Sequence, residues 1–185
     1  MNKRTFLQYL AFNSLALGSA HTVAQPASAP AGAPASAPAA APKSPIHHTL
    51  VGLDSDGKPL SLDSFAGQTC LVTFFTADCN LCTKELKLMR EFYTKNRKRN
   101  FTLIGVNLDE KQSDFAEYMK LVTLSVPADA RFPIVWRNAP NHRDSFGPIN
   151  RKPTHFMLDK AHNQLLKREG SFLPNDWDDL WTMLG

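Results

Sequence analysis

The chain has 185 residues and a formal net charge of +4, a length that suits one folded domain with additional sequence rather than two domains. Three of these net positive charges lie in the first 45 residues, which contain no acidic residue, so the rest of the chain is close to neutral. Because no basic stripe interleaved with aromatic residues is present, we expect no nucleic-acid partner. Three cysteines are too few for a disulfide-rich scaffold.

The first 24 residues have the layout of a secretory signal peptide, with a basic tip, a modest apolar stretch and small residues near the end. We expect cleavage after Ala20 or Ala24 and export to the periplasm, where disulfides form and persist. Polar residues such as Gln8 interrupt the apolar stretch, which makes it a poor permanent membrane span. The alternative is an uncleaved anchor, so membrane contact is expected only through this segment.

Residues 25–45 form a low-complexity stretch dominated by proline and alanine. This stretch has almost no apolar bulk to bury, which predicts a disordered linker. The folded domain is therefore expected at residues 46–185, a length sufficient to bury one hydrophobic core.

The pattern of apolar residues predicts alternating strands and helices in this domain. The segment "HTLVGLDSDGKPLSLDSF" predicts a hairpin with its turn at Asp56–Gly57, and the apolar run "TCLVTFF" predicts a buried strand. The later elements are expected as a helix at 80–99, a strand at 101–109, a helix at 113–122 capped by Ser113, strands at 132–137, 154–159 and 164–172, and an amphipathic helix at 174–185. This order predicts an α/β sandwich around a mixed sheet.

The segment "TADCNLCTKEL" places Cys79 and Cys82 three apart, where the buried strand leads into the first predicted helix. Residues three apart share one side of a helix, and their Cα atoms are then roughly 5 to 6 Å apart, within the range that a disulfide needs. The first helical turn also offers unpaired N–H groups and a positive dipole end, which stabilise a thiolate. We therefore predict a redox pair in which Cys79 attacks and Cys82 resolves.

Three other interpretations of the cysteine pair are open. A metal site needs about four ligands, yet the chain has no second C-x-x-C motif and no closely spaced histidine pair besides His47–His48. A peroxidase would show a P-x-x-x-T-x-x-C pattern, in which Thr76 fits but Val72 stands where the proline should be. The two thiols could also be inert core residues, which is the role we expect for Cys70 in the predicted buried strand.

The segment "LVTFFTADCNLCTKEL" resembles the active-site segment of the thioredoxin superfamily, and its last three residues are typical of the periplasmic TlpA/ResA-like thiol–disulfide oxidoreductases. The segment "KPTHFMLDKAHNQLLKREGSF" resembles the second signature of that family, in which a proline opens a strand. The resemblance covers about residues 50–185. It implies a thioredoxin-like three-layer sandwich, in which helices flank a mixed central β-sheet, with an N-terminal β-hairpin extension.

The resemblance also implies roles for single residues. Pro153 matches the family's cis-proline, which packs against the cysteine pair, and its neighbours Lys152 and Thr154 are expected to contact the substrate. Glu85 matches an acidic residue three positions after the second cysteine, where a carboxylate could take or give the proton that exchange requires. The alternative for Glu85 is an exposed carboxylate that only suits the first turns of a helix.

Asp78 departs from the family, whose usual residue before the first cysteine is tryptophan. A carboxylate beside Cys79 disfavours the thiolate and opposes the effect of the helix dipole. Asp78 could also serve as the N-cap of the helix. We expect it to tune the reactivity of Cys79.

The sequence therefore predicts an exported thiol–disulfide oxidoreductase that exchanges disulfides with partner proteins through a mixed disulfide and acts as a reductant. The Cys79–Cys82 disulfide is its redox group, and neither a dissociable cofactor nor a metal is expected. By resemblance, a membrane thiol reductase supplies the electrons, and the substrates include apocytochromes or metallochaperones. The alternative is a redox-inactive thioredoxin-fold binding module or a copper-handling protein.

Overall fold

A computed structural model of the chain describes residues 44–184. The predicted signal peptide and nearly all of the predicted linker lie outside these residues, so both assignments stay predictions. None of the helices in the described part combines the length and the apolar character that spanning a bilayer requires.

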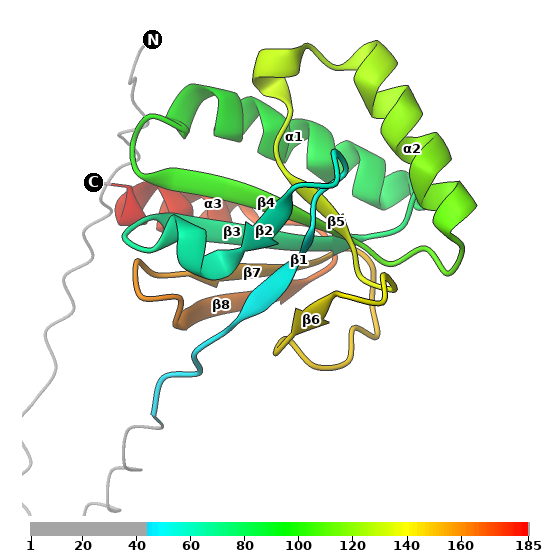
Figure 1. Ribbon diagram of the computed structural model, residues 1–185. Coiled ribbons are helices and arrows are strands. Elements are labelled where there is room, and N and C mark those ends of the chain that lie inside the picture. Colours follow the sequence, from blue (N-terminus) through cyan, green and yellow to red (C-terminus); the bar gives the residue numbers. More distant parts are fainter. Residues whose placement is uncertain (1–43, 185) are drawn as a thin grey trace, which may run out of the picture. The chain divides into compact units, whose positions relative to one another are not determined.

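The centre of the domain is a mixed sheet of five strands in the order β5-β4-β3-β7-β8 (Figure 1). Its strands are β3 (Thr69–Phe75), β4 (Phe101–Asn107), β5 (Ile134–Trp136), β7 (Thr154–Leu158) and β8 (Gln164–Glu169). The first three run parallel to one another, and β7 is antiparallel to both β3 and β8. The mixed sheet and the strands predicted for it are thereby confirmed.

Helices α1 (Asn80–Asn96) and α3 (Pro174–Met183) lie on one face of this sheet, and α2 (Gln112–Ser125) lies beside the edge strand β5 (Figure 1). Apolar side chains from both layers meet in one cluster, which includes Leu71 of β3, Met89 of α1 and Leu180 of α3. Burying such side chains stabilises the fold by roughly 1.5 to 3 kcal/mol each. This cluster lies under the start of α1 and so supports the cysteine pair.

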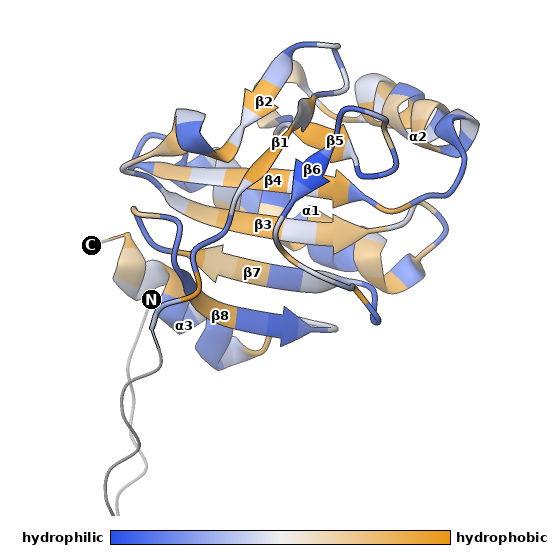
Figure 2. Ribbon diagram, turned by 60° about the horizontal axis from the view of Figure 1, so that its bottom comes forward, coloured by the Kyte–Doolittle hydropathy of each residue, from blue (hydrophilic) through white to orange (hydrophobic). Residues whose placement is uncertain are grey.

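The opposite face is covered by a small antiparallel sheet in the order β2-β1-β6 and by a short 3₁₀ helix (Figure 2). These elements are β1 (Leu50–Leu53), β2 (Pro59–Ser61), β6 (Arg143–Asp144) and η1 (Leu62–Phe65). The hairpin β1–β2 is the predicted N-terminal extension. Its turn depends on Gly57, whose φ of 77° is in the left-handed region that glycine adopts without strain.

Strand β3 is buried along its whole length because it is covered on both faces. Its side chains alternate between the two sides, with Leu71 and Phe75 toward the helices and Val72 and Phe74 toward the small sheet. The apolar colour of β3 and β4 in Figure 2 reflects this double coverage. The apolar run in the sequence is therefore a central strand, as predicted.

The predicted helix boundaries were only partly right, and α2 ends at Ser125 rather than at residue 122. Helix α1 ends at Asn96 rather than at residue 99, where the Asn96 amide donates back to the Phe92 carbonyl and Asn100 takes a positive φ of 54°. Ser113 does not cap α2, because the cap position is Lys111 and the Ser113 hydroxyl donates to the carboxylate of Asp114 instead. Of the predicted apolar face of α3, Leu180 and Leu184 are buried but Trp181 is half exposed.

A buried ion pair attaches β6 to the rest of the domain. The guanidinium of Arg137 donates to both carboxylate oxygens of Asp144, at 2.8 and 2.7 Å, and His142 Nε2 lies 2.8 Å from the same carboxylate. Burial alone would raise the pKa of Asp144, but the hydrogen bonds with His142 and Arg137 and the charge of Arg137 outweigh it and lower that pKa to about 2.

We expect this carboxylate to make stability depend on acid pH. Because the folded pKa of Asp144 is below its unfolded value, its contribution is present above about pH 5 and is lost as the pH falls toward 2. Urea unfolding should show that Asp144→Asn costs on the order of 2 kcal/mol at neutral pH. The stability difference between the two proteins should shrink steadily below pH 5, and a difference that stays constant down to pH 2.5 would contradict the assignment.

Candidate active site

The cysteine pair lies where β3 passes through a short loop into α1. Cys79 is the N-cap of α1, and its Sγ accepts the N–H of Cys82 at 3.1 Å. The two residues form a disulfide, with their Cα atoms 5.1 Å apart, as expected for two residues one helical turn apart. The suggestion that Asp78 caps the helix was wrong, because the cap falls one residue later.

The two sulfurs differ in exposure. Cys79 is partly exposed, whereas Cys82 is fully buried in the cluster between the sheet and the helices. A partner protein can therefore reach Cys79 but not Cys82. The third cysteine, Cys70, is buried, as predicted, in β3, and its burial raises the pKa of its thiol to about 12, so it has almost no reactive thiolate at neutral pH.

Glu85 is one turn beyond Cys82 on the buried side of α1. Only 6% of its surface is exposed, and its Oε2 accepts the backbone N–H of Phe172 at 3.2 Å. The alternative of an exposed carboxylate was therefore wrong. The structure instead buries an ionisable group on the same helix face as the buried sulfur.

Pro153 directly precedes β7, and the Lys152–Pro153 peptide bond is cis. The first residue of β7, Thr154, pairs with Phe74 near the end of β3, so the Pro153 loop and the cysteine loop meet at the same edge of the sheet. Thr154 is buried, and its hydroxyl donates to the Arg151 carbonyl at 2.6 Å. Lys152 is exposed, as is its neighbour Arg151.

A cleft of about 390 Å³ opens beside the cysteine loop. Asp78 and Lys152 both line it, and the other charged residues of its walls are Asp109, Glu110, Lys111 and Asp114. Within residues 44–184, no three side chains of the types His, Cys, Asp and Glu are grouped so as to hold a metal ion. The cleft is thus a charged surface next to Cys79.

Asp109 is a site residue that the sequence interpretation missed. It is only 8% exposed, and its carboxylate accepts the N–H of Ala77, two residues before Cys79. The signal was the pair of polar residues in "NLD", at the end of the second parallel strand, because polar residues at the carboxyl ends of parallel strands often line a functional cleft.

Comparisons with known proteins agree with this geometry. Residues 38–163 match the AhpC/TSA family, which is more than half of the chain. The chain belongs to the AhpC/TSA family. This membership confirms the predicted relation to the thioredoxin superfamily.

Individual relatives include thiol-disulfide oxidoreductases and peroxiredoxins. The thiol-disulfide oxidoreductase ResA of Bacillus thuringiensis subsp. konkukian is 27% identical over 107 residues, which cover 58% of each chain. The chloroplastic peroxiredoxin Q of Sedum lineare is 29% identical over 167 residues, which cover 88% of this chain and 87% of that one. The chain thus spans little more than half the length of the ResA relatives that it matches.

Solved structures confirm the fold. A thiol:disulfide interchange protein of the thioredoxin family from Chlorobium tepidum TLS superposes with a TM-score of 0.61 at 26% identity, covering 80% of this chain and all of that one. StoA from Bacillus subtilis gives a TM-score of 0.52 at 25% identity, covering 71% of this chain and 96% of that one. The thioredoxin-like architecture predicted for this AhpC/TSA family member is confirmed.

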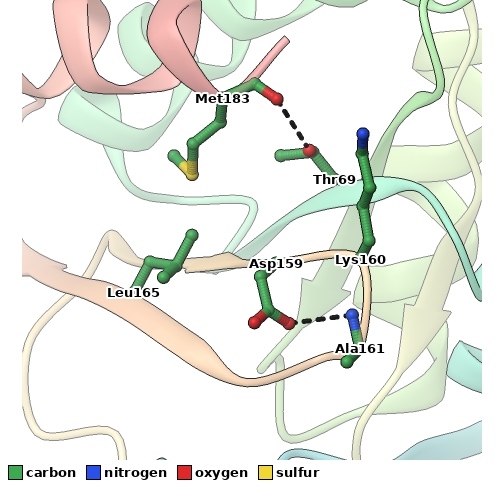
Figure 3. Close-up of a pocket in the computed structure, with 6 residues that line it drawn as sticks. All are labelled: Thr69, Asp159, Lys160, Ala161, Leu165 and Met183. Atoms are coloured by element: carbon green, nitrogen blue, oxygen red, sulfur yellow. Dashed lines mark hydrogen bonds between the residues drawn. The ribbon is translucent and has the colours of Figure 1, made fainter.

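A second cavity of this AhpC/TSA family member, about 290 Å³ in volume, lies at the other end of the sheet (Figure 3). Thr69 at the start of β3 lines it, and its hydroxyl donates to the Met183 carbonyl at 3.4 Å. The opposite wall is the turn after β7, where Asp159 accepts the N–H of Ala161 at 2.8 Å. Because Cys79 follows the other end of β3, this cavity has no part in the redox site.

His155 lies in β7, two residues after Pro153, and is buried. Burial lowers the pKa of its imidazole to about 4, although a hydrogen bond with the backbone of Gly170 and the charge of Asp176 oppose the shift. The ring is therefore neutral at physiological pH. It packs edge-on against the ring of Phe172, with 5.0 Å between the ring centroids. The backbone N–H of the same Phe172 donates to Glu85.

We expect the negative charge of Asp78 to destabilise the thiolate of reduced Cys79. In Asp78→Asn the negative charge next to the sulfur is lost, so the pKa of the reduced Cys79 should fall by about half a unit to one unit. The pH dependence of the alkylation rate of Cys79 measures this shift. The control is Asp56→Asn, which removes an exposed carboxylate of the β1–β2 turn. The expectation is wrong if the pKa of Cys79 is the same in the two variants.

Proposed function

We propose that this protein is an exported thiol–disulfide oxidoreductase of the TlpA/ResA type that reduces disulfides of partner proteins. The observation that carries the proposal is the disulfide between a partly exposed Cys79 at a helix N-cap and a fully buried Cys82. The names of the ResA relatives and of the Chlorobium tepidum structure support the same activity.

The reaction proceeds from the reduced pair in two displacements. The Cys79 thiolate attacks one sulfur of a partner disulfide, which forms a mixed disulfide and releases the other partner sulfur as a thiolate. The Cys82 thiolate then attacks the sulfur of Cys79, which closes the Cys79–Cys82 disulfide and releases the second partner thiolate. The partner gains two electrons, and the oxidised pair must be reduced again by another dithiol.

The surroundings of the pair suit each displacement. The N-terminal end of α1 stabilises negative charge on Cys79, because its Sγ already accepts a helix N–H. Cys82 must lose a proton in a buried place, and the buried carboxylate of Glu85 one turn away is the group that we assign to accept it. Burial of Cys82 also prevents a partner from attacking it.

The partner is proposed to bind across the cleft and the Pro153 loop, where Lys152 and Asp78 present opposite charges. We place the protein in the periplasm, divided into a signal peptide at 1–24, a linker at 25–45 and a thioredoxin-like domain at 46–185. A membrane thiol reductase is proposed as the electron donor, and apocytochromes or metallochaperones with oxidised cysteines as substrates. The redox-active disulfide itself requires no dissociable cofactor.

Reduction of insulin disulfides by the purified protein tests the activity. The wild type should catalyse it with dithiothreitol as donor, and Cys79→Ser should reduce the rate to the uncatalysed background. Cu(I) titration of the reduced wild type accompanies the assay. If the protein shows no Cys79-dependent reduction but binds one Cu(I) per chain, the proposal is replaced by a copper-handling function. If it shows neither reduction nor Cu(I) binding, the remaining assignment is a redox-inactive binding module.

A further inference from the structure

The position of Cys79 depends on a loop of three residues, Thr76–Asp78, between β3 and α1. This loop is a tight turn, in which the N–H of Cys79 points at the carbonyl of Thr76 at 3.4 Å. Its central residue, Ala77, donates its N–H outward to both carboxylate oxygens of Asp109, at 3.1 and 3.2 Å. One side chain from the neighbouring strand end therefore holds the middle of the loop.

Asp109 is itself fixed by residues at the ends of β4 and β5 and just beyond them. The Asn107 amide donates to its Oδ2 at 2.7 Å, and the N–H of Asp109 donates to Asn107 Oδ1 at 3.1 Å. Its carbonyl accepts Trp136 Nε1 at 2.7 Å and Asn138 Nδ2 at 2.9 Å. Since Trp136 ends β5 and Asn107 ends β4, the carboxylate connects the cysteine loop to the rigid part of the sheet.

The hydrogen bonds at this position require a carboxylate. Both oxygens of Asp109 accept, one from Asn107 and both from Ala77. The orientation of the Asn107 amide is set, because its oxygen accepts the N–H of Asp109. An amide at position 109 would point its NH₂ group at a donor in either orientation, and a buried donor facing a donor costs about 1 to 3 kcal/mol.

We propose that Asp109 is a positioning residue that holds the Thr76–Asp78 loop so that the sulfur of Cys79 stays within bonding reach of Cys82. The proposal rests on the proposed function for its biological meaning, but it concerns the stability of the disulfide itself. Asp109 acts through the backbone of Ala77 and takes no part in the displacements. Releasing the loop should lower the effective concentration of the two sulfurs toward each other.

The equilibrium between the cysteine pair and glutathione tests the proposal. In Asp109→Asn the equilibrium constant for closing the Cys79–Cys82 disulfide should fall at least about tenfold, which corresponds to a reduction potential about 30 mV less negative.

Two controls keep the test independent of folding and of the proposed function. Glu117→Gln removes an exposed carboxylate of α2 that does not line the cleft and should leave the constant unchanged. If Asp109→Asn does not fold, Asp109→Ala, in which water from the cleft can replace the carboxylate, should show the same fall. The proposal is overturned if the folded Asp109→Asn variant, or Asp109→Ala, closes the disulfide with the wild-type equilibrium constant, whatever the insulin assay shows.

Discussion

Cys82→Ser is expected to attack disulfides normally and then to stop. With a chromogenic aromatic disulfide, the reduced wild type should release about two equivalents of thiolate, one for the attack by Cys79 and one for the resolution by Cys82. The variant should release only about one, because no second sulfur lies behind Cys79. Its multiple-turnover rate with a protein disulfide should fall at least about 100-fold, since the intramolecular step is lost.

The matched variant for this test is Cys79→Ser. It should release almost no thiolate in the native state, because Cys82 and Cys70 are both buried. A stalled mixed disulfide from Cys82→Ser also captures the natural partner and so identifies the pathway. Two equivalents from Cys82→Ser, or a rapid release from Cys79→Ser, would mean that the roles of the two cysteines are assigned wrongly.

Glu85→Gln is expected to slow the second release without changing the first. Glutamine keeps an oxygen that can accept the Phe172 N–H, so the local structure should persist while the proton acceptor is lost. At neutral pH the resolving step should slow about 100-fold, at the lower end of what general base catalysis contributes. The defect should shrink as the pH rises toward 10, because hydroxide can then accept the proton that Glu85 accepts at neutral pH.

Stopped-flow measurement of both release phases between pH 6 and 10 checks this expectation. Glu91→Gln is the control, because Glu91 is an exposed carboxylate of the same helix and should affect neither phase. A second phase in Glu85→Gln that equals the wild type at neutral pH would show that Glu85 is a structural partner of Phe172 only.

Much of the fold follows from local sequence patterns. The apolar run at residues 69–75 is the buried strand β3, with the predicted ends. The Asp56–Gly57 turn joins the predicted hairpin, since Asp54 Oδ1 accepts the N–H groups of Asp56 and Lys58. The cysteine spacing likewise predicted a pair that can close, because helix geometry alone fixes the distance between residues three apart.

Local sequence patterns could not predict contacts between distant parts of the chain. Strand β6 has only two residues, and it exists because Arg143 pairs with Val51 of the hairpin. The burial of Glu85 depends on Phe172, which comes from beyond β8. The role of Asp109 depends on a loop 32 residues earlier in the chain, and no periodicity connects the two.

Limited alkylation of the reduced protein tests the central claim most directly. The protein is treated at neutral pH with less than one equivalent of iodoacetamide, and the label on each cysteine is measured by peptide mass spectrometry. Because only Cys79 is both partly exposed and placed at a helix N-terminus, nearly all of the label should be on Cys79. Label on Cys82 or Cys70 at a comparable level would contradict the account of an exposed attacking thiol and a buried resolving thiol.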